Sequence, residues 1–203
     1  MKDNIERLDN DEDYYGEFGK QFLSNSDIKS LLENPSQFKH SEKTLPMLIG
    51  NYFHTAMMEP DKLDDYPILD VATRNNKAYK ESAMGELIML QREVDEITML
   101  TDKMKGNMDI FDIIYAKGNK FEVPMIKELH SEMWKGKADI VTDTHVIDLK
   151  TTSDISKFKS SAWVYNYDSQ AYLYQEFFGK PMKFIVGCKK TLQLGVFECS
   201  PEF

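Results

Sequence analysis

The sequence contains little cysteine, no long apolar run and no internal repeat. Two cysteines among 203 residues cannot build a disulfide framework, and we therefore expect a reducing, cytoplasmic location. No apolar stretch approaches the ~20 residues that a membrane helix needs. The opening residues also lack the apolar run of a secretory signal. With 41% apolar and 29% charged residues, the composition is that of a soluble globular protein of one domain.

Positive charge is also scarce. The chain has 25 basic and 34 acidic residues, a net charge of −9, which argues against simple electrostatic attraction to nucleic acid. Seven of the acids lie within the first 17 residues. We therefore expect an acidic N-terminal arm over residues 1–22 and a single domain over residues 23–203. Lysines remain available in the second half, at positions 135, 137, 150, 157, 159, 180, 183, 189 and 190.

Residues 136–152 carry the most informative pattern in the chain. Two short apolar β-branched runs flank the polar segment 142–145, which predicts a β-hairpin. If the hairpin closes near residues 143–144, Asp139 lies within reach of Asp148. Residues two apart on a strand point to the same face, so Lys150 emerges beside Asp148. Two converging carboxylates require a counter-charge, which predicts a divalent metal and phosphodiester chemistry.

The same pattern has a simpler interpretation. An Asp-x-Lys sequence also occurs by chance on exposed strands, where both side chains are merely solvated. The apolar Ile147 before the motif and the threonines Thr151 and Thr152 after it favour a strand that enters a core. The motif alone does not decide between the two.

Other segments predict a sheet flanked by helices. We expect a helix over residues 27–33 and another over residues 45–58, where apolar residues follow the helical period. We expect a strand at residues 97–100, a helix from Thr101 to Tyr115, a helix over residues 163–178 and a closing hairpin near the end. The predicted class is α/β or α+β.

The helix over residues 45–58 places Gly50 and His54 on one face, because they are four residues apart. A single histidine on a helix is more often a packed or surface residue than a ligand. Gly50, one turn earlier, leaves open space that a substrate or metal could use.

Four motifs follow one another along the chain: Gly50-x-x-x-His54, Gly136-x-x-Asp139, Asp148-x-Lys150 and Gln170-x-x-x-Tyr174. In this order they resemble the RecB-like branch of the PD-(D/E)XK nuclease superfamily. The front half, residues 24–39 followed by residues 48–60, is similar to the catalytic domain of RecE-type exonuclease VIII. The resemblance covers about residues 23–178 and implies an α/β fold with a PD-(D/E)XK nuclease-like core, in which helices flank a mixed central sheet.

The resemblance also implies a function. Its members are 5′-to-3′ exonucleases that degrade one strand of double-stranded DNA from its ends and leave 3′ tails for recombination by annealing. They depend on Mg²⁺ or Mn²⁺, with two ions per site. They act in phages and prophages inside a bacterial cell, beside a single-strand annealing protein, and form homo-oligomeric rings.

Residue by residue, the resemblance implies three groups of functional positions. The metal ligands would be His54, Asp139, Asp148 and the backbone carbonyl of Leu149, and the catalytic residues would be Lys150, Asp148, Asp139 and Glu128. Glu132 stays open as the alternative to Glu128. The DNA contacts would be Gln170, Tyr174, Thr151 and Thr152, and the first two of these would alternatively order the active site.

Two other functions remain open. One is a nuclease of the same superfamily with another mode of action, such as an endonuclease or a helicase-associated nuclease. The other is a non-catalytic acidic DNA mimic or DNA-binding protein, which the net charge favours. The retained Lys150 beside Asp148 argues against the mimic, because a mimic needs no lysine there.

Overall fold

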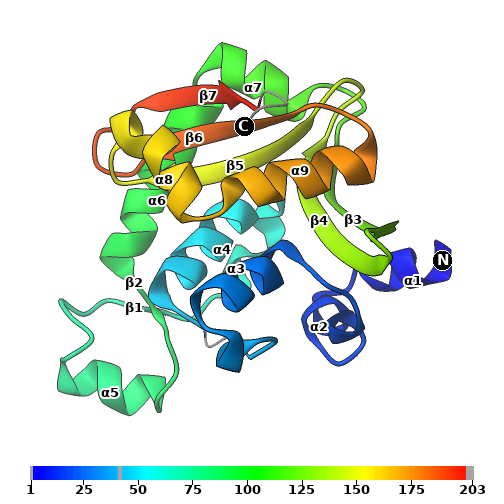
Figure 1. The fold of residues 1–203 in the computed structure, drawn as a ribbon. Coiled ribbons are helices and arrows are strands. Elements are labelled where there is room, and N and C mark those ends of the chain that lie inside the picture. Colours follow the sequence, from blue (N-terminus) through cyan, green and yellow to red (C-terminus); the bar gives the residue numbers. More distant parts are fainter. Residues whose placement is uncertain (1, 41–42, 200–203) are drawn as a thin grey trace.

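The computed structural model describes residues 2–40 and 43–199. Its main sheet is mixed, with the strand order β3-β4-β5-β6-β7, and only β5 and β6 are parallel neighbours (Figure 1). The strands are β3 (Lys120–Leu129), β4 (Glu132–Val141), β5 (Val146–Thr152), β6 (Met182–Cys188) and β7 (Leu194–Glu198). A separate parallel pair consists of β1 (Ile68–Leu69) and β2 (Met89–Leu90).

Helices cover both faces of the main sheet (Figure 1). The α-helices are α1 (Lys2–Arg7), α2 (Asp11–Tyr15), α3 (Asn25–Glu33), α4 (Leu45–Met58), α5 (Lys77–Ala83), α6 (Gln91–Lys105), α7 (Met108–Tyr115), α8 (Phe158–Val164) and α9 (Tyr167–Phe178). Short 3₁₀ helices are η1 (Gly19–Gln21), η2 (Pro35–Gln37), η3 (Pro60–Asp65) and η4 (Ile155–Lys157).

Two apolar clusters lie on opposite faces of the sheet. The first joins α4, α6 and α7 to the sheet through buried residues such as Phe53, Ile147 and Ile185. The second joins α8 and α9 to the other face through residues such as Phe177 and Phe184. The mixed α/β sheet flanked by helices is therefore confirmed.

The predicted strand at residues 97–100 is wrong, and the predicted helix from Thr101 to Tyr115 is divided between the end of α6 and α7. Residues 97–100 lie inside α6 and do not form a strand, and α7 begins after Asn107, whose side chain accepts a hydrogen bond from the backbone N–H of Ile110. The buried residues of α6 include Val94, Ile97 and Leu100, which recur every three residues and so follow the helical period. The predicted helices over residues 27–33 and 45–58 are present as α3 and α4.

Gly136 allows α9 to pack closely on β4. A Cβ atom at this position would lie 2.7 Å from Phe177 and 3.1 Å from Tyr174, whereas a Cβ atom at Gly50 would meet nothing within 4 Å. We predict that Gly136→Ala lowers the free energy of unfolding by about 1–3 kcal/mol through overpacking. Gly50→Ala, the control in an open helical position, should raise it by up to about 1 kcal/mol. Urea unfolding measures both, and a Gly136→Ala protein as stable as the parent would contradict the packing.

Candidate functional site

The β4–β5 hairpin brings two acids together as predicted. Ile140 pairs with Ile147 and Val141 with Val146, so that Asp139 and Asp148 are the next residues along the two strands. Both are buried, with 8% and 3% of their surface exposed. The backbone N–H of Leu149 donates a 2.7 Å hydrogen bond to Asp139 Oδ2, which fixes this carboxylate against β5.

His54 reaches the same place from α4. The buried residues Phe53 and Met57 hold this helix on the sheet. The His54 Nδ1 atom consequently lies 3.2 Å from Asp139 Oδ2. Asp139 raises the pKa of His54 against the opposing effect of burial. The resemblance grouped His54 with Asp139, and the two side chains are in contact in the structure. The role of His54 as a metal ligand stays a prediction.

The sequence analysis missed the third acid, Glu122. Ligand atoms of His54, Glu122 and Asp139 all lie within 4.8 Å of one another. Glu122 belongs to β3, where its neighbours Phe121 and Val123 pair with Ile140 and Ala138, and it therefore lies opposite Asp139.

The backbone of Glu122 adopts a left-handed conformation with φ of 49°. Such a conformation costs a non-glycine residue about 1–3 kcal/mol and is concentrated at functional sites. The strain is consistent with a carboxylate that the surrounding strands hold in position.

The structure does not bring Glu128 or Glu132 into this group. Glu128 pairs with Met133, is exposed and lies six residues from Glu122, ~20 Å along the strand. Glu132 starts β4 directly after the turn at His130 and Ser131, so it too lies at the far end of the hairpin. The chain reverses at residues 130 and 131, between β3 and β4, so Glu122 takes the place expected for Glu128.

This reversal had a weak signal in the sequence. Both turn residues have positive φ, 54° for His130 and 64° for Ser131, which suits a two-residue hairpin turn. Such turns favour Asn-Gly or Asp-Gly, and His-Ser is not a recognisable example. Pairing residues outward from this turn would have placed Glu122 opposite Asp139.

Asp148 has two close polar neighbours, one at each carboxylate oxygen. Lys150 Nζ lies 2.6 Å from Asp148 Oδ2, and Gln170 Nε2 donates a 2.5 Å hydrogen bond to Asp148 Oδ1. Asp148 Oδ2 is buried and accepts no hydrogen bond from any residue that the structure describes, although the lysine charge is close. A buried charged oxygen is costly unless it is paired, and Lys150 supplies the opposite charge at Oδ2.

The protonation of the site reflects competing carboxylates. Burial and the charge of Asp139 together raise the pKa of Glu122 to about 7, although His54 and Lys137 lower it. Burial also raises the pKa of Asp148, against the lowering effect of Lys150. The pKa of Asp139 shifts in the opposite direction. Burial alone would raise it, but the nearby His54 and Lys150 hold it below the usual value. Proximity to Asp148 raises the pKa of Lys150, which burial alone would lower.

The remaining predicted residues have structural contacts. The Tyr174 hydroxyl donates to the Lys137 carbonyl and accepts from the Lys137 N–H, at 3.0 and 3.2 Å, and the residue is buried. Tyr174 is thus bound to the backbone of β4, and Gln170 is bound to Asp148. These contacts favour a role of both residues in ordering the active site over direct contact with DNA. Thr152 hydrogen-bonds the backbone of Asp154. DNA contacts by Thr151 and Thr152, and the Leu149 carbonyl as a ligand, stay predictions.

The donor set fits a divalent cation. It offers one imidazole, the clustered carboxylates of Glu122 and Asp139, and the carboxylate of Asp148, which the Lys150 ammonium contacts at Oδ2. Carboxylate oxygens suit Mg²⁺, and an imidazole nitrogen shifts the preference toward Mn²⁺. These residues would hold the ion, and the ion would in turn relieve the repulsion among the carboxylates.

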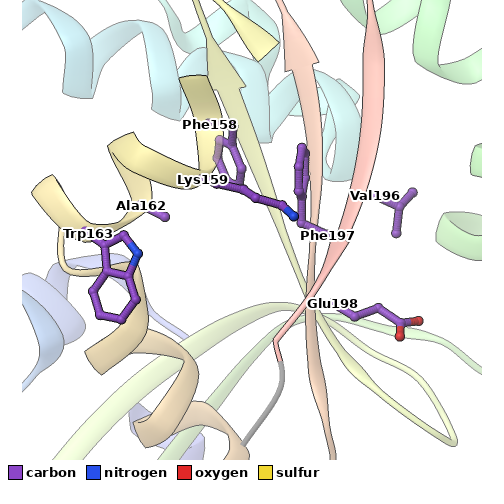
Figure 2. A pocket seen from close by; sticks show the side chains of 7 residues that line it. All are labelled: Phe158, Lys159, Ala162, Trp163, Val196, Phe197 and Glu198. Carbon is purple, nitrogen blue, oxygen red and sulfur yellow. The ribbon is translucent and has the colours of Figure 1, made fainter. Parts of the chain in front are cut away.

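A separate hollow of about 370 Å³ lies between α8 and β7 (Figure 2). Side chains from both elements line it, and none belongs to the acidic group. The lining residues are Phe158, Lys159, Ala162, Trp163, Val196, Phe197 and Glu198. The position of the acids, and not the volume of a cavity, therefore locates the candidate site.

The mixed sheet with its buried Asp139 and Asp148-x-Lys150 is that of a PDDEXK-like domain. Residues 20–188 match the family described as "PDDEXK-like domain of unknown function (DUF3799)", and the chain belongs to this family. A search of curated proteins finds no match. Among the described residues, no helix combines the length and apolar character needed to cross a membrane.

Solved structures share the fold. A crystal structure from Eubacterium rectale, described as a "Putative exonuclease", aligns with a TM-score of 0.70 and 19% identity over 95% of this chain and 78% of the other. The crystal structure of SSO0001 aligns at a TM-score of 0.35 and 13% identity, over 74% of this chain and 78% of the other, and is too distant to inform the fold.

We predict that Mn²⁺ binding depends on Glu122 and Asp139. Removing a carboxylate ligand should weaken binding by about 10-fold or more, since even the partners of ligands contribute about 10–100-fold. Isothermal titration calorimetry of Glu122→Gln and Asp139→Asn measures this loss. Glu128→Gln is the matched control on the same strand and should bind as the parent does. A loss in Glu128→Gln without one in Glu122→Gln would overturn the assignment.

Proposed function

We propose that the protein is a metal-dependent DNA exonuclease of the RecE type, which degrades one strand of duplex DNA in the 5′-to-3′ direction. The observation that carries the proposal is the group of His54, Glu122 and Asp139 beside the buried Asp148–Lys150 pair. Family membership and the fold shared with the Eubacterium rectale protein support it. The product would be a 3′ single-stranded tail, the substrate of a single-strand annealing protein in recombination.

The residues have distinct tasks in this reaction. Bound Mg²⁺ or Mn²⁺ would lower the pKa of a water molecule and neutralise phosphoryl charge. His54, Glu122, Asp139 and Asp148 would hold the metal ion in position. Lys150 presents a compact positive charge that stabilises the negative charge developing on the phosphoryl oxygens.

The residues around Asp148 orient it for this task. Gln170 donates a hydrogen bond to one oxygen of Asp148, and the Lys150 ammonium lies 2.6 Å from the other. Tyr174 ties α9 to the backbone of Lys137, two residues before Asp139. Both residues therefore keep the two acidic strands in register.

The first test compares DNA ends and strands. We predict that, with Mg²⁺, a label at the 5′ end of a linear duplex is released at once as a mononucleotide. A label at the 3′ end should stay on progressively shorter fragments, and closed circular DNA should survive. Gel electrophoresis of a time course measures all three, with EDTA and Asp139→Asn as inactive controls.

Each rival predicts a different outcome. An endonuclease of the same superfamily would cut the closed circle. A non-catalytic DNA mimic would leave every substrate intact at all metal concentrations. Release of the 3′ label first would contradict the proposed polarity while leaving a nuclease in place.

The second test separates binding from chemistry at Lys150. We predict that Lys150→Met leaves duplex affinity in Ca²⁺ nearly unchanged and slows single-turnover cleavage by about 10²–10³-fold, the usual cost of one electrostatic contact to the transition state. Lys157→Met, at a lysine whose side chain is 75% exposed, serves as the control and should cut at the parental rate. A Lys150→Met protein that binds poorly but cuts normally would show a role in phosphate binding only.

A further inference from the structure

The acidic N-terminal arm packs beside the candidate site. Leu8, Tyr14 and Phe22 are buried in a cluster with Ile126 of β3, and Figure 1 shows α1 and α2 near the end of the β3–β4 hairpin. Backbone hydrogen bonds extend the contact, because the chain at Leu23 pairs with β4 on both sides of Trp134. Apolar burial and backbone hydrogen bonds therefore hold the arm against β3 and β4.

The arm covers three lysines of the domain. Lys39 Nζ donates to the carbonyls of Lys20 and Phe22, at 2.5 and 2.7 Å. Lys135 Nζ donates to the carbonyl of Tyr14 and lies 4.1 Å from the centre of the Tyr14 ring. These two lysines therefore bind the backbone of the arm and contribute to its docking.

Lys137 differs because its main partner is a carboxylate. Its Nζ atom lies 2.6 Å from Asp11 Oδ1 and 3.5 Å from the carbonyl of Asp9. The side chain of Lys137 is only 9% exposed, whereas that of Asp11 is 68% exposed. The exposed carboxylate of Asp11, on the five-residue helix α2, therefore contacts the ammonium group of a lysine that is nearly buried.

Lys137 also lies close to the candidate metal ligands Glu122 and Asp139. It precedes Asp139 by two residues on β4. Its positive charge lowers the pKa of Glu122, although burial and Asp139 raise that pKa more. A phosphodiester positioned for cleavage at His54, Glu122 and Asp139 would therefore have Lys137 beside it.

We propose that Asp11 occupies, in the free protein, the position of a DNA phosphate on Lys137, and that the acidic arm competes with DNA for this lysine. Carboxylate and phosphate are both oxyanions that accept charge-assisted hydrogen bonds from an ammonium group. The inference rests on the proposed function, because it requires DNA at this site. Releasing Asp11 would free the Lys137 ammonium for a phosphate oxygen.

The test measures DNA affinity apart from cleavage. Fluorescence anisotropy of a labelled blunt duplex in Ca²⁺ gives the dissociation constant of the parent, Asp11→Asn, Lys137→Gln and the double variant. Glu12→Gln is the matched control, since it removes one charge from the same helix at a side chain with no ion pair among the described residues.

Asp11→Asn should bind DNA about threefold to tenfold more tightly than the parent, because Lys137 no longer exchanges one oxyanion for another. Glu12→Gln should change affinity by less than about twofold, as expected for a more distant screened charge. In the Lys137→Gln background, Asp11→Asn should gain no more than Glu12→Gln does in the parent.

The outcomes distinguish this inference from the proposed function. If the parent neither binds nor cuts DNA, the proposed function fails and this inference fails with it. If the parent binds and cuts, but Asp11→Asn binds no more tightly than Glu12→Gln, only this inference fails and the Asp11–Lys137 pair is structural. An equal gain with and without Lys137 would likewise overturn it. Melting curves confirm that each variant is folded.

Discussion

The repulsion among three neighbouring carboxylates is the constraint on which the rest of the site depends. Asp139 and Asp148 are buried on adjacent strands, and Glu122 lies opposite Asp139 on a third. Charges removed from water must be paired or neutralised. Two nearby cations, Lys150 and His54, offset part of this negative charge, and Glu122 responds by a pKa raised to about 7. A divalent ion would complete the neutralisation, so the same electrostatic problem that destabilises the empty site favours metal binding.

The fold meets this constraint with elements far apart in the sequence. The helix α4 supplies His54, β3 supplies Glu122, and β4 and β5 supply the two aspartates. Apolar packing that does not involve the charged side chains holds these elements in place. Phe53 packs α4 on the sheet, and Gly136 lets α9 approach β4. Removing a polar group from the site should therefore alter its chemistry more than its fold.

Local patterns predicted the parts of the site that depend on local structure. The hairpin joining Asp139 to Asp148 followed from two β-branched runs around a polar turn. Helical spacing put His54 on a face with Gly50, and only the resemblance to RecB-like nucleases grouped it with the two aspartates. Glu122 did not follow, because its position depends on where β3 and β4 reverse, and His130-Ser131 carries no strong turn signal. Residues 97–100 were misassigned for a related reason: the short apolar pattern fits a strand, and only the longer window from Val94 to Met104 shows the helical period.

The central claim is that His54, Glu122 and Asp139 bind a divalent cation next to Asp148. X-ray diffraction from crystals soaked in Mn²⁺, with data collected on both sides of the manganese absorption edge, tests it most directly. The account predicts an anomalous peak within ~2.0–2.6 Å of ligand atoms from these residues, the range for oxygen and nitrogen ligands. A peak elsewhere on the protein, or none at a Mn²⁺ concentration that supports cleavage, would contradict it.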